Sequence, residues 1–193
     1  MGISLQKGQR ISLEKAAGKK LSKMIMGLGW DAVKRTGFMS MFTKQKSVDL
    51  DASCVLFDAN GKDRDQVWYR QLHSRDGSVV HTGDNVTGAG EGDDEQIIVD
   101  LANVPADVAT MLFLVTSYSG QGFSSVANAY VRMIDDQTKT EVARYDLSCQ
   151  GDHTAQVMCK IYRHESEWKV QAIGESASGR NLQEVLPVLR KLL

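Results

Sequence analysis

The sequence predicts a mainly β protein, a two-sheet β-sandwich with a few short helices that include a C-terminal one. Short apolar runs recur along the chain, and turn signals rich in glycine separate them. Just two prolines occur, Pro105 and Pro187, so little interrupts these runs. Short strands divided by such turns are typical of sandwiches. The 193 residues can bury a sizeable core, and we expect residues 1–193 to form a single domain.

Ten segments have the pattern of strands, namely 11–13, 23–27, 48–57, 66–72, 96–101, 110–117, 128–134, 141–147, 156–163 and 168–173. In segment 48–57 the even positions are all apolar, whereas the odd positions begin with Asp49 and Asp51. Successive side chains of a strand point to opposite faces. Both aspartates are therefore expected on the face that points away from the core.

The turns between these segments support the same order of strands. Asn60-Gly61 follows segment 48–57, and this pair favours a hairpin turn because it tolerates positive φ. Asp76-Gly77 is a similar pair, and residues 135–138 bridge two further strands. These turn residues therefore lie where the chain of a sandwich must reverse its direction between strands.

Two segments depart from the strand pattern. Segment 34–46 is basic and carries Phe38, Met39, Met41 and Phe42. It could be a mobile loop, which we favour, or a short amphipathic element that binds a partner. Segment 180–193 has apolar residues at helical spacing, and Pro187 either starts this helix or kinks it. Packing of the helix on the sandwich is favoured over a role in dimerisation.

Composition and charge exclude several classes of protein. Hydrophobic residues make up 42% of the chain, charged residues 24%, and the net charge is −1, so direct binding of nucleic acid is not expected. No apolar run approaches the length of a membrane span, so no transmembrane segment is expected. The cysteines Cys54, Cys149 and Cys159 form no Cys-x-x-Cys motif, which fits a reducing cytoplasm.

The most informative segment is 81–95, which combines four glycines with five carboxylates and contains no lysine or arginine. The carboxylates are Asp84, Glu91, Asp93, Asp94 and Glu95. Three of them are consecutive and repel one another unless something neutralises them. A hard divalent cation would do so, because Ca²⁺ takes six to eight oxygen ligands in flexible geometry. A solvated acidic loop is the alternative, and the glycine spacing and the Asp84-Asn85 pair favour the metal.

The spacing of this segment does not match an EF-hand. Asp84 to Glu95 spans the twelve positions of such a loop, but Val86 and Gly88 stand where oxygen ligands are needed. Asp31, Asp49 and Asp51 could supply further carboxylates from other loops at one end of a sandwich. Oxygen ligands of this kind favour Ca²⁺ or Mg²⁺ over Zn²⁺, and clustered flexible acids favour Ca²⁺.

Catalytic motifs are absent from the sequence. It has no Gly-x-Ser-x-Gly elbow and no nucleotide-binding Gly-x-x-x-x-Gly-Lys-Ser/Thr loop. We therefore expect a protein that is not an enzyme. Two alternatives stay open: a thiol-dependent protein that handles a soft oxyanion through Cys54, Cys149 and Cys159, and a metal-dependent hydrolase that uses the clustered acids.

Several blocks of residues together resemble the TerD family, and they run in order over nearly the whole chain. They are 27–31 (Gly-Leu-Gly-Trp-Asp), 49–53 (Asp-Leu-Asp-Ala-Ser), 80–88, 90–95, 104–105, 120–123, 126–129 and 143–147. The basic segment after Asp31, and Gly179-Arg180, are similar to the TerZ-like branch of the family.

The resemblance implies a cytoplasmic β-sandwich that binds Ca²⁺, with more than one ion, in bacterial tellurite resistance and general stress response. It further implies partners among other Ter-operon proteins and a peripheral, membrane-associated complex at the inner membrane. The family's metal ligands carry over to Asp31, Asp84, Asn85, Asp93, Asp94 and Glu95, and they extend to Asp49 and Asp51. Ala89-Gly90-Glu91 departs from the Glu-Gly-Asp of many relatives, and Glu91 keeps the charge there with a longer reach.

Overall fold

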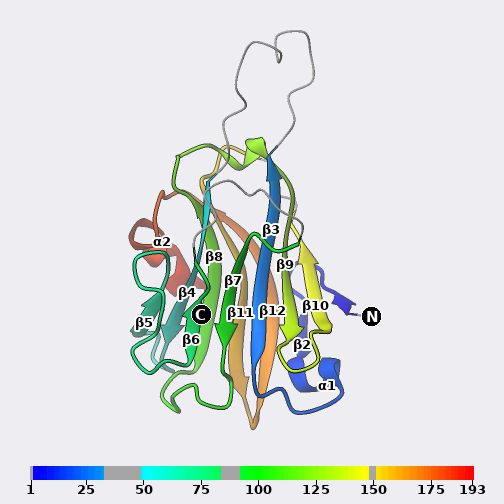
Figure 1. Cartoon of the computed structure of the whole chain (residues 1–193). Coiled ribbons are helices and arrows are strands. Elements are labelled where there is room, and N and C mark those ends of the chain that lie inside the picture. The colour runs from blue at the N-terminus through cyan, green and yellow to red at the C-terminus, as the bar shows by residue number, and fades with distance from the viewer. Residues whose placement is uncertain (1, 33–48, 84–91, 148–150) are drawn as a thin grey trace, which may run out of the picture.

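A computed structural model describes residues 2–32, 49–83, 92–147 and 151–193, which form two packed six-stranded sheets (Figure 1). Sheet A has the order β1 (Ile3–Ser4), β10 (Glu141–Asp146), β9 (Val126–Asp135), β3 (Met24–Ala32), β7 (Glu95–Val99) and β6 (Val79–His81). Sheet B has the order β2 (Arg10–Ser12), β12 (Glu167–Ala177), β11 (Ala155–His164), β8 (Thr110–Ser117), β4 (Leu50–Phe57) and β5 (Asp63–Val67). The predicted two-sheet sandwich is confirmed.

The strand predictions hold for most of the chain, although β3 and β12 run four or more residues beyond their predicted ends, to Ala32 and Ala177. The short strands β1 and β6 do not stand out in the sequence, because two or three residues are too few for a periodic pattern. The strand predicted over 66–72 is wrong beyond Val67. There the N–H of Trp68 donates to the carbonyl oxygen of Gln71 (3.0 Å), and the N–H of Gln71 donates back (2.9 Å), so the chain turns.

Strand β4 is buried on both faces. Leu50, Ala52, Cys54 and Leu56 face the core between the sheets, as predicted. Val55 and Phe57 point away from that core, yet they are fully buried in a second apolar cluster on the outer face of sheet B. The face that carries Asp51 is therefore largely covered by protein, and Asp51 itself is 4% exposed.

The second cluster exists because the C-terminal helix α2 (Leu182–Leu189) packs on sheet B. Its buried side chains are Leu182, Val185, Leu186 and Leu189. The Asn181 side chain caps the helix by accepting from the N–H groups of Gln183 and Glu184. The favoured interpretation, packing on the sandwich, is confirmed, and Pro187 lies inside the helix rather than at its start.

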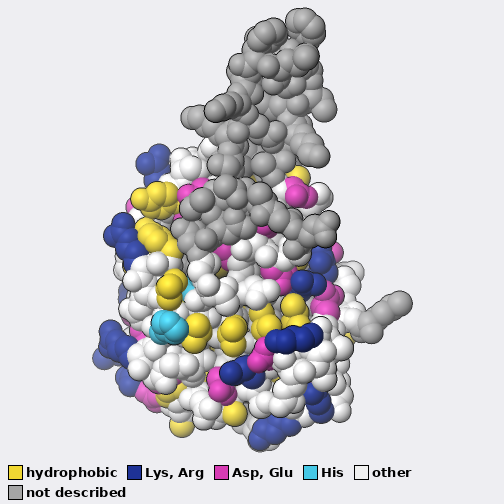
Figure 2. Space-filling view, in the orientation of Figure 1, with side chains coloured by type: hydrophobic (Ala, Val, Ile, Leu, Met, Phe, Trp, Pro, Cys, Tyr) yellow, Lys and Arg dark blue, Asp and Glu magenta, His cyan; other side chains and the backbone are white. Residues whose placement is uncertain are grey.

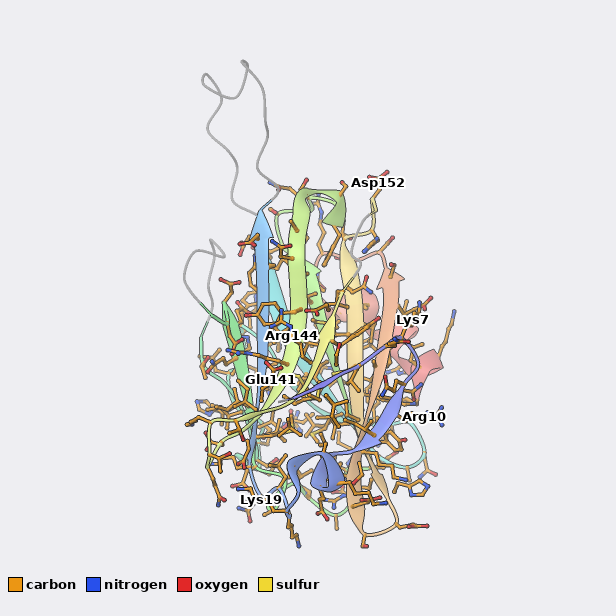
Figure 3. The ribbon with its side chains drawn as sticks, turned by 90° about the vertical axis from the view of Figure 1, so that its right-hand side faces the viewer. Lys7, Arg10, Lys19, Glu141, Arg144 and Asp152 are labelled. Atoms are coloured by element: carbon orange, nitrogen blue, oxygen red, sulfur yellow. The ribbon has the colours of Figure 1, made fainter. Side chains whose placement is uncertain are left out.

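The N-terminal segment joins the edges of the two sheets. Strand β1 pairs in parallel with β10 of sheet A, and β2 pairs with β12 of sheet B, so residues 3–12 cross from one sheet to the other. The short helix α1 (Leu13–Ala17) follows, with Ser12 as its N-cap. Figure 3 shows this crossing, with Lys19 near one end of the sandwich and Asp152 at the other.

The 3₁₀ turns η2 (Phe123–Ser125) and η3 (Arg190–Leu192) precede β9 and follow α2. No helix within the described ranges is long and apolar enough to cross a membrane.

We predict that Leu189→Ala lowers the free energy of unfolding by about 2–5 kcal/mol, because it removes a fully buried side chain and leaves a cavity between α2 and sheet B. Urea unfolding measures this change. Leu193→Ala is the matched control, since Leu193 is 41% exposed and its truncation should cost less than about 1 kcal/mol. Equal losses in the two variants would show that α2 does not pack on the sheet.

Candidate metal site at the acidic pole

The end of β3 and the beginnings of β4 and β7 meet at one end of the sandwich, which we term the acidic pole (Figure 1). Six of the nine predicted ligands belong to this end, and they are Asp31, Asp49, Asp51, Asp93, Asp94 and Glu95. The other three, Asp84, Asn85 and Glu91, lie outside the described residues, as does segment 34–46.

Asp93 lies on the outer face of sheet A, where an arginine neutralises it. Its Oδ1 accepts hydrogen bonds from Arg132 Nε (2.7 Å) and Tyr130 Oη (3.2 Å), and its Oδ2 accepts one from Gln96 Nε2 (3.1 Å). The Asp93 side chain is fully buried by these contacts. A Cβ at Gly27 would come within 2.2 Å of Asp93 Oδ2, so the carboxylate fits there because β3 has glycine at that position.

Asp94 is bound to strand β3 of the same sheet. Its N–H donates to the carbonyl oxygen of Leu28 (2.7 Å), and its Oδ2 accepts from the N–H of Trp30 (2.8 Å). Burial raises the pKa of Asp94, and the charges of Asp31, Glu95 and Asp93 raise it further, against the opposing effect of the Trp30 hydrogen bond. Asp94 therefore lies in the negative field of three neighbouring carboxylates.

Glu95 points between the sheets and bridges them. Its Oε2 accepts from the N–H of Ala52 in β4 of sheet B (2.7 Å). Strand β5 ends at Val67, opposite Cys54, so the Ala52 N–H lies beyond the reach of that strand. The carboxylate of a sheet A residue thus takes the place of a missing strand partner in sheet B.

His81 supports Glu95 from β6. Its Nε2 lies 3.3 Å from Glu95 Oε2, without the alignment of a hydrogen bond, and both side chains are at most 1% exposed. The N–H of Gly83 donates to His81 Nδ1 (3.1 Å). In the neutral ring the proton consequently lies on Nε2, which faces the carboxylate.

Asp31 is exposed at the end of β3, and its Oδ2 accepts from Asn128 Nδ2 (2.8 Å). Asn128 has φ of +52°, at the point where the register between β3 and β9 shifts, and this left-handed backbone accompanies the contact. The Asp51 side chain points away from the acids of sheet A. It lies on the outer face of sheet B, on the opposite side of β4 from Ala52 and Glu95.

Among the described residues, Asp94 is therefore the carboxylate on which the charges of Asp31, Asp93 and Glu95 act together. Within this part of the chain, no three histidine, cysteine or acidic side chains are arranged to hold a metal ion by themselves. A cation at this pole thus requires further oxygen ligands. Carboxylate and carbonyl oxygens are ligands that suit Ca²⁺ better than Zn²⁺.

Sequence reasoning missed the side chains that hold the acids in place, which are His81, Gln96, Asn128, Tyr130 and Arg132. The sequence contains one signal for these contacts, a pair of alternating glycines. Gly27 and Gly29 alternate with buried residues in β3, and a Cβ at Gly29 would collide with the Tyr130 ring. Alternating glycines in a strand indicate that other side chains lie across its outer face.

Two of the three cysteines are poorly placed for chemistry with tellurite. Cys54 and Cys159 are fully buried in the core, on the two strands that flank Phe113 of β8. Burial raises the pKa of both thiols, so the reactive thiolate is disfavoured. Cys149 lies outside the described residues.

The fold and the pole define a class of protein, a two-sheet β-sandwich whose carboxylates gather at one end. The TerD domain model matches residues 1–187. The chain therefore belongs to the TerD family.

Relatives and solved structures agree with this assignment. Tellurium resistance protein TerZ of Serratia marcescens is 45% identical over 184 residues, which cover 95% of this chain and 94% of the relative. General stress protein 16U of Bacillus subtilis is 43% identical over 187 residues, 93% of each chain. A crystal structure of a homologue of telluride resistance protein (TerD) from Streptomyces coelicolor shares the fold, with a TM-score of 0.66 and 17% identity, over 83% of this chain and 92% of that one.

We predict that Asp93→Asn lowers the free energy of unfolding by about 1.5–3 kcal/mol in EDTA, because it removes the charged partner of the Arg132 hydrogen bond. Urea unfolding measures the change. Asp146→Asn is the control, since Asp146 also pairs with an arginine but its side chain is 64% exposed, and its loss should stay below about 1 kcal/mol. Similar values for both variants would contradict a structural role for Asp93.

A second prediction concerns pH. The folded-state pKa of Asp94 is raised above its ordinary value of 3.8, so ionised Asp94 subtracts from stability. This penalty is fully present above the folded pKa and disappears as the pH falls through it. In EDTA, Asp94→Asn should therefore raise the free energy of unfolding at neutral pH. This gain should shrink as the pH falls through the folded-state pKa of Asp94. Carboxyl ¹³C NMR checks the midpoint directly, and a midpoint at or below 3.8 would refute the assignment.

Proposed function

We propose that this protein is a Ca²⁺-binding module that is not an enzyme, and that the acidic pole is its metal site. The observation that carries the proposal is the position of Asp94, which is hydrogen-bonded to Leu28 and Trp30 at the end of β3, close to the exposed Asp31 and between Asp93 and Glu95 in the chain. Such a concentration of negative charge is costly unless a cation compensates it. At an effective dielectric constant of 20, two like charges 4 Å apart repel by about 4 kcal/mol.

Asp31 and Asp94 are the described residues best placed to hold the ion. Asp31 is exposed at the pole, and Asp94 lies within its field. Asp84, Asn85 and Glu91 complete the proposed ligand set from segment 84–91. Asp51 points to the outer face of sheet B, so in this proposal Asp49 and Asp51 serve a separate ion on the β4 side. When bound, Ca²⁺ supplies positive charge and fixes oxygen ligands from several segments. More than one ion fits the number of carboxylates.

Asp93 and Glu95 have a second role in this proposal. Arg132 already neutralises Asp93, and Glu95 binds the Ala52 N–H and faces His81. These contacts fix the start of β7 and hence the backbone position of Asp94 between them. We therefore assign Asp93 and Glu95 mainly to positioning, although both stay within the predicted ligand set.

The biological role follows from the family. Relatives are described as tellurium resistance and general stress proteins, and we infer a role for this chain in tellurite resistance and stress response. We propose that it works in the cytoplasm with other Ter-operon proteins, in a complex that is peripheral at the inner membrane. The buried thiols of Cys54 and Cys159 give no support to the thiol-dependent alternative.

Calorimetry tests the metal proposal. Titration of the EDTA-treated, desalted protein with Ca²⁺ should release or absorb heat, and free Ca²⁺ at a hundredfold excess over Kd should stabilise the fold by about 2.7 kcal/mol. For a chain of this size, Tm should rise by about 5–10 °C. Mg²⁺ should bind more weakly, because it demands stricter octahedral geometry.

The matched variants are Asp31→Asn and Asp152→Asn. Both residues are exposed acids, and both lie at the acidic pole, as Figure 3 shows for Asp152. Asp31→Asn should weaken Ca²⁺ binding by about ten-fold or more, whereas Asp152→Asn should leave it nearly unchanged. An absence of heat together with an unchanged Tm would refute the metal site.

A further inference from the structure

A cluster of three aromatic rings and one arginine lies on the surface beside the acidic pole, and we term it the aromatic–arginine surface. It consists of Trp68, Tyr69, Arg70 and Tyr118. The rings of Trp68 and Tyr69 meet edge to face with centroids 4.9 Å apart, and those of Tyr69 and Tyr118 do so at 5.8 Å. In Figure 2, yellow and dark-blue side chains lie next to each other along the left margin, the side on which Figure 1 places β5.

The backbone holds this surface in a fixed arrangement. Trp68 and Gln71 pair through two backbone hydrogen bonds, so Tyr69 and Arg70 form the tip of a tight turn at the end of β5. Trp68 packs against the second apolar cluster under α2. Tyr118 follows β8, and its N–H donates to the carbonyl oxygen of Asp49 (3.2 Å). Rigid aromatic side chains of this kind lose little entropy when a partner binds.

Arg70 is exposed and held by the rings. Its guanidinium carbon lies 5.7 Å from the centroid of Trp68 and 5.4 Å from that of Tyr69. The arginines that form ion pairs in the described part of the chain are Arg64, Arg75, Arg132, Arg144 and Arg190, and Arg70 is not one of them. Stacking orients the guanidinium while its N–H donors stay available for a carboxylate.

The surroundings of Arg70 add apolar area. Segment 68–75 has no carboxylate of its own, and Asp65 of β5 pairs with Arg75 rather than with Arg70. Tyr118 is 52% exposed and Leu72 is 37% exposed, two of the four exposed large apolar side chains among the described residues. Tryptophan, tyrosine and arginine are the residues that contribute most to binding energy at protein interfaces. Their combination here indicates a site for an anionic and partly apolar ligand.

We propose that the aromatic–arginine surface docks a segment of a partner protein that carries a single carboxylate beside apolar side chains. A carboxylate of the partner pairs with Arg70, and a neighbouring apolar side chain packs against Tyr69 and Tyr118. Single-stranded nucleic acid also stacks on aromatic rings. The protein has a net charge of −1, and Tyr118 adjoins Asp49 of the acidic pole, so a phosphate chain would meet repulsion along most of its length. An isolated carboxylate avoids that penalty.

Fluorescence anisotropy with two labelled peptides tests the proposal. The first carries one glutamate flanked by leucines, and the second has glutamine in place of that glutamate. The glutamate peptide should bind, and the glutamine peptide should bind about ten-fold more weakly or worse, since charge-assisted hydrogen bonds are the stronger kind. NMR of the ¹⁵N-labelled protein should place the shifted amides in segment 68–72 and at Tyr118.

Variants at exposed positions, which should not disturb the fold, provide the second part of the test. Arg70→Gln and Tyr118→Ala alter exposed side chains, and each should weaken binding of the glutamate peptide by about ten-fold. Arg10→Gln removes the same charge from an exposed arginine of β2 and should have little effect. Equal binding of both peptides, an equal loss in Arg10→Gln and Arg70→Gln, or displacement of the peptide by oligouridylate at lower concentrations than by unlabelled peptide would each overturn the proposal.

Discussion

Three consecutive carboxylates at the start of β7 point in three directions, and each is held by a different strand. Asp93 binds Arg132 of β9 on the outer face of sheet A, Asp94 binds the Trp30 N–H of β3, and Glu95 crosses to the Ala52 N–H of sheet B. Like charges so close in sequence would repel strongly if they shared one side of the chain. Their separation fixes the start of β7 and connects both sheets at the acidic pole.

This arrangement changes the meaning of the acidic segment. In the sequence, residues 93–95 resemble three equivalent ligands, whereas in the structure Asp93 has an arginine partner and Glu95 replaces a backbone partner of β4. Asp94 is left between them with a raised pKa, next to the exposed Asp31. Asp93 and Glu95 therefore position the acidic pole, and a cation would bind mainly Asp94 and Asp31.

The sandwich itself was predictable, because strand alternation and turn residues are local signals. The apolar even positions from Leu50 to Leu56 face the inter-sheet core as expected. The second core beneath α2 was missed, although Val55 and Phe57 extend the apolar run to both faces. Strand β5 ends earlier than predicted. Trp68 and Tyr69 are residue types that favour strands, so the sequence predicted a strand there, but the backbone turns at these residues. The partners Arg132, His81 and Asn128 depend on register between distant strands, which one sequence does not determine.

Hydrogen exchange at the Ala52 amide tests the central claim most directly, namely that each of the three acids holds its own strand. In EDTA, the Ala52 amide should be protected in the wild-type protein, because Glu95 accepts its hydrogen bond. In Glu95→Ala, NMR should show that Ala52 loses protection while the Trp30 amide, bound by Asp94, keeps it. Rapid exchange at Ala52 in the wild type, or loss of protection at both amides together, would contradict the account.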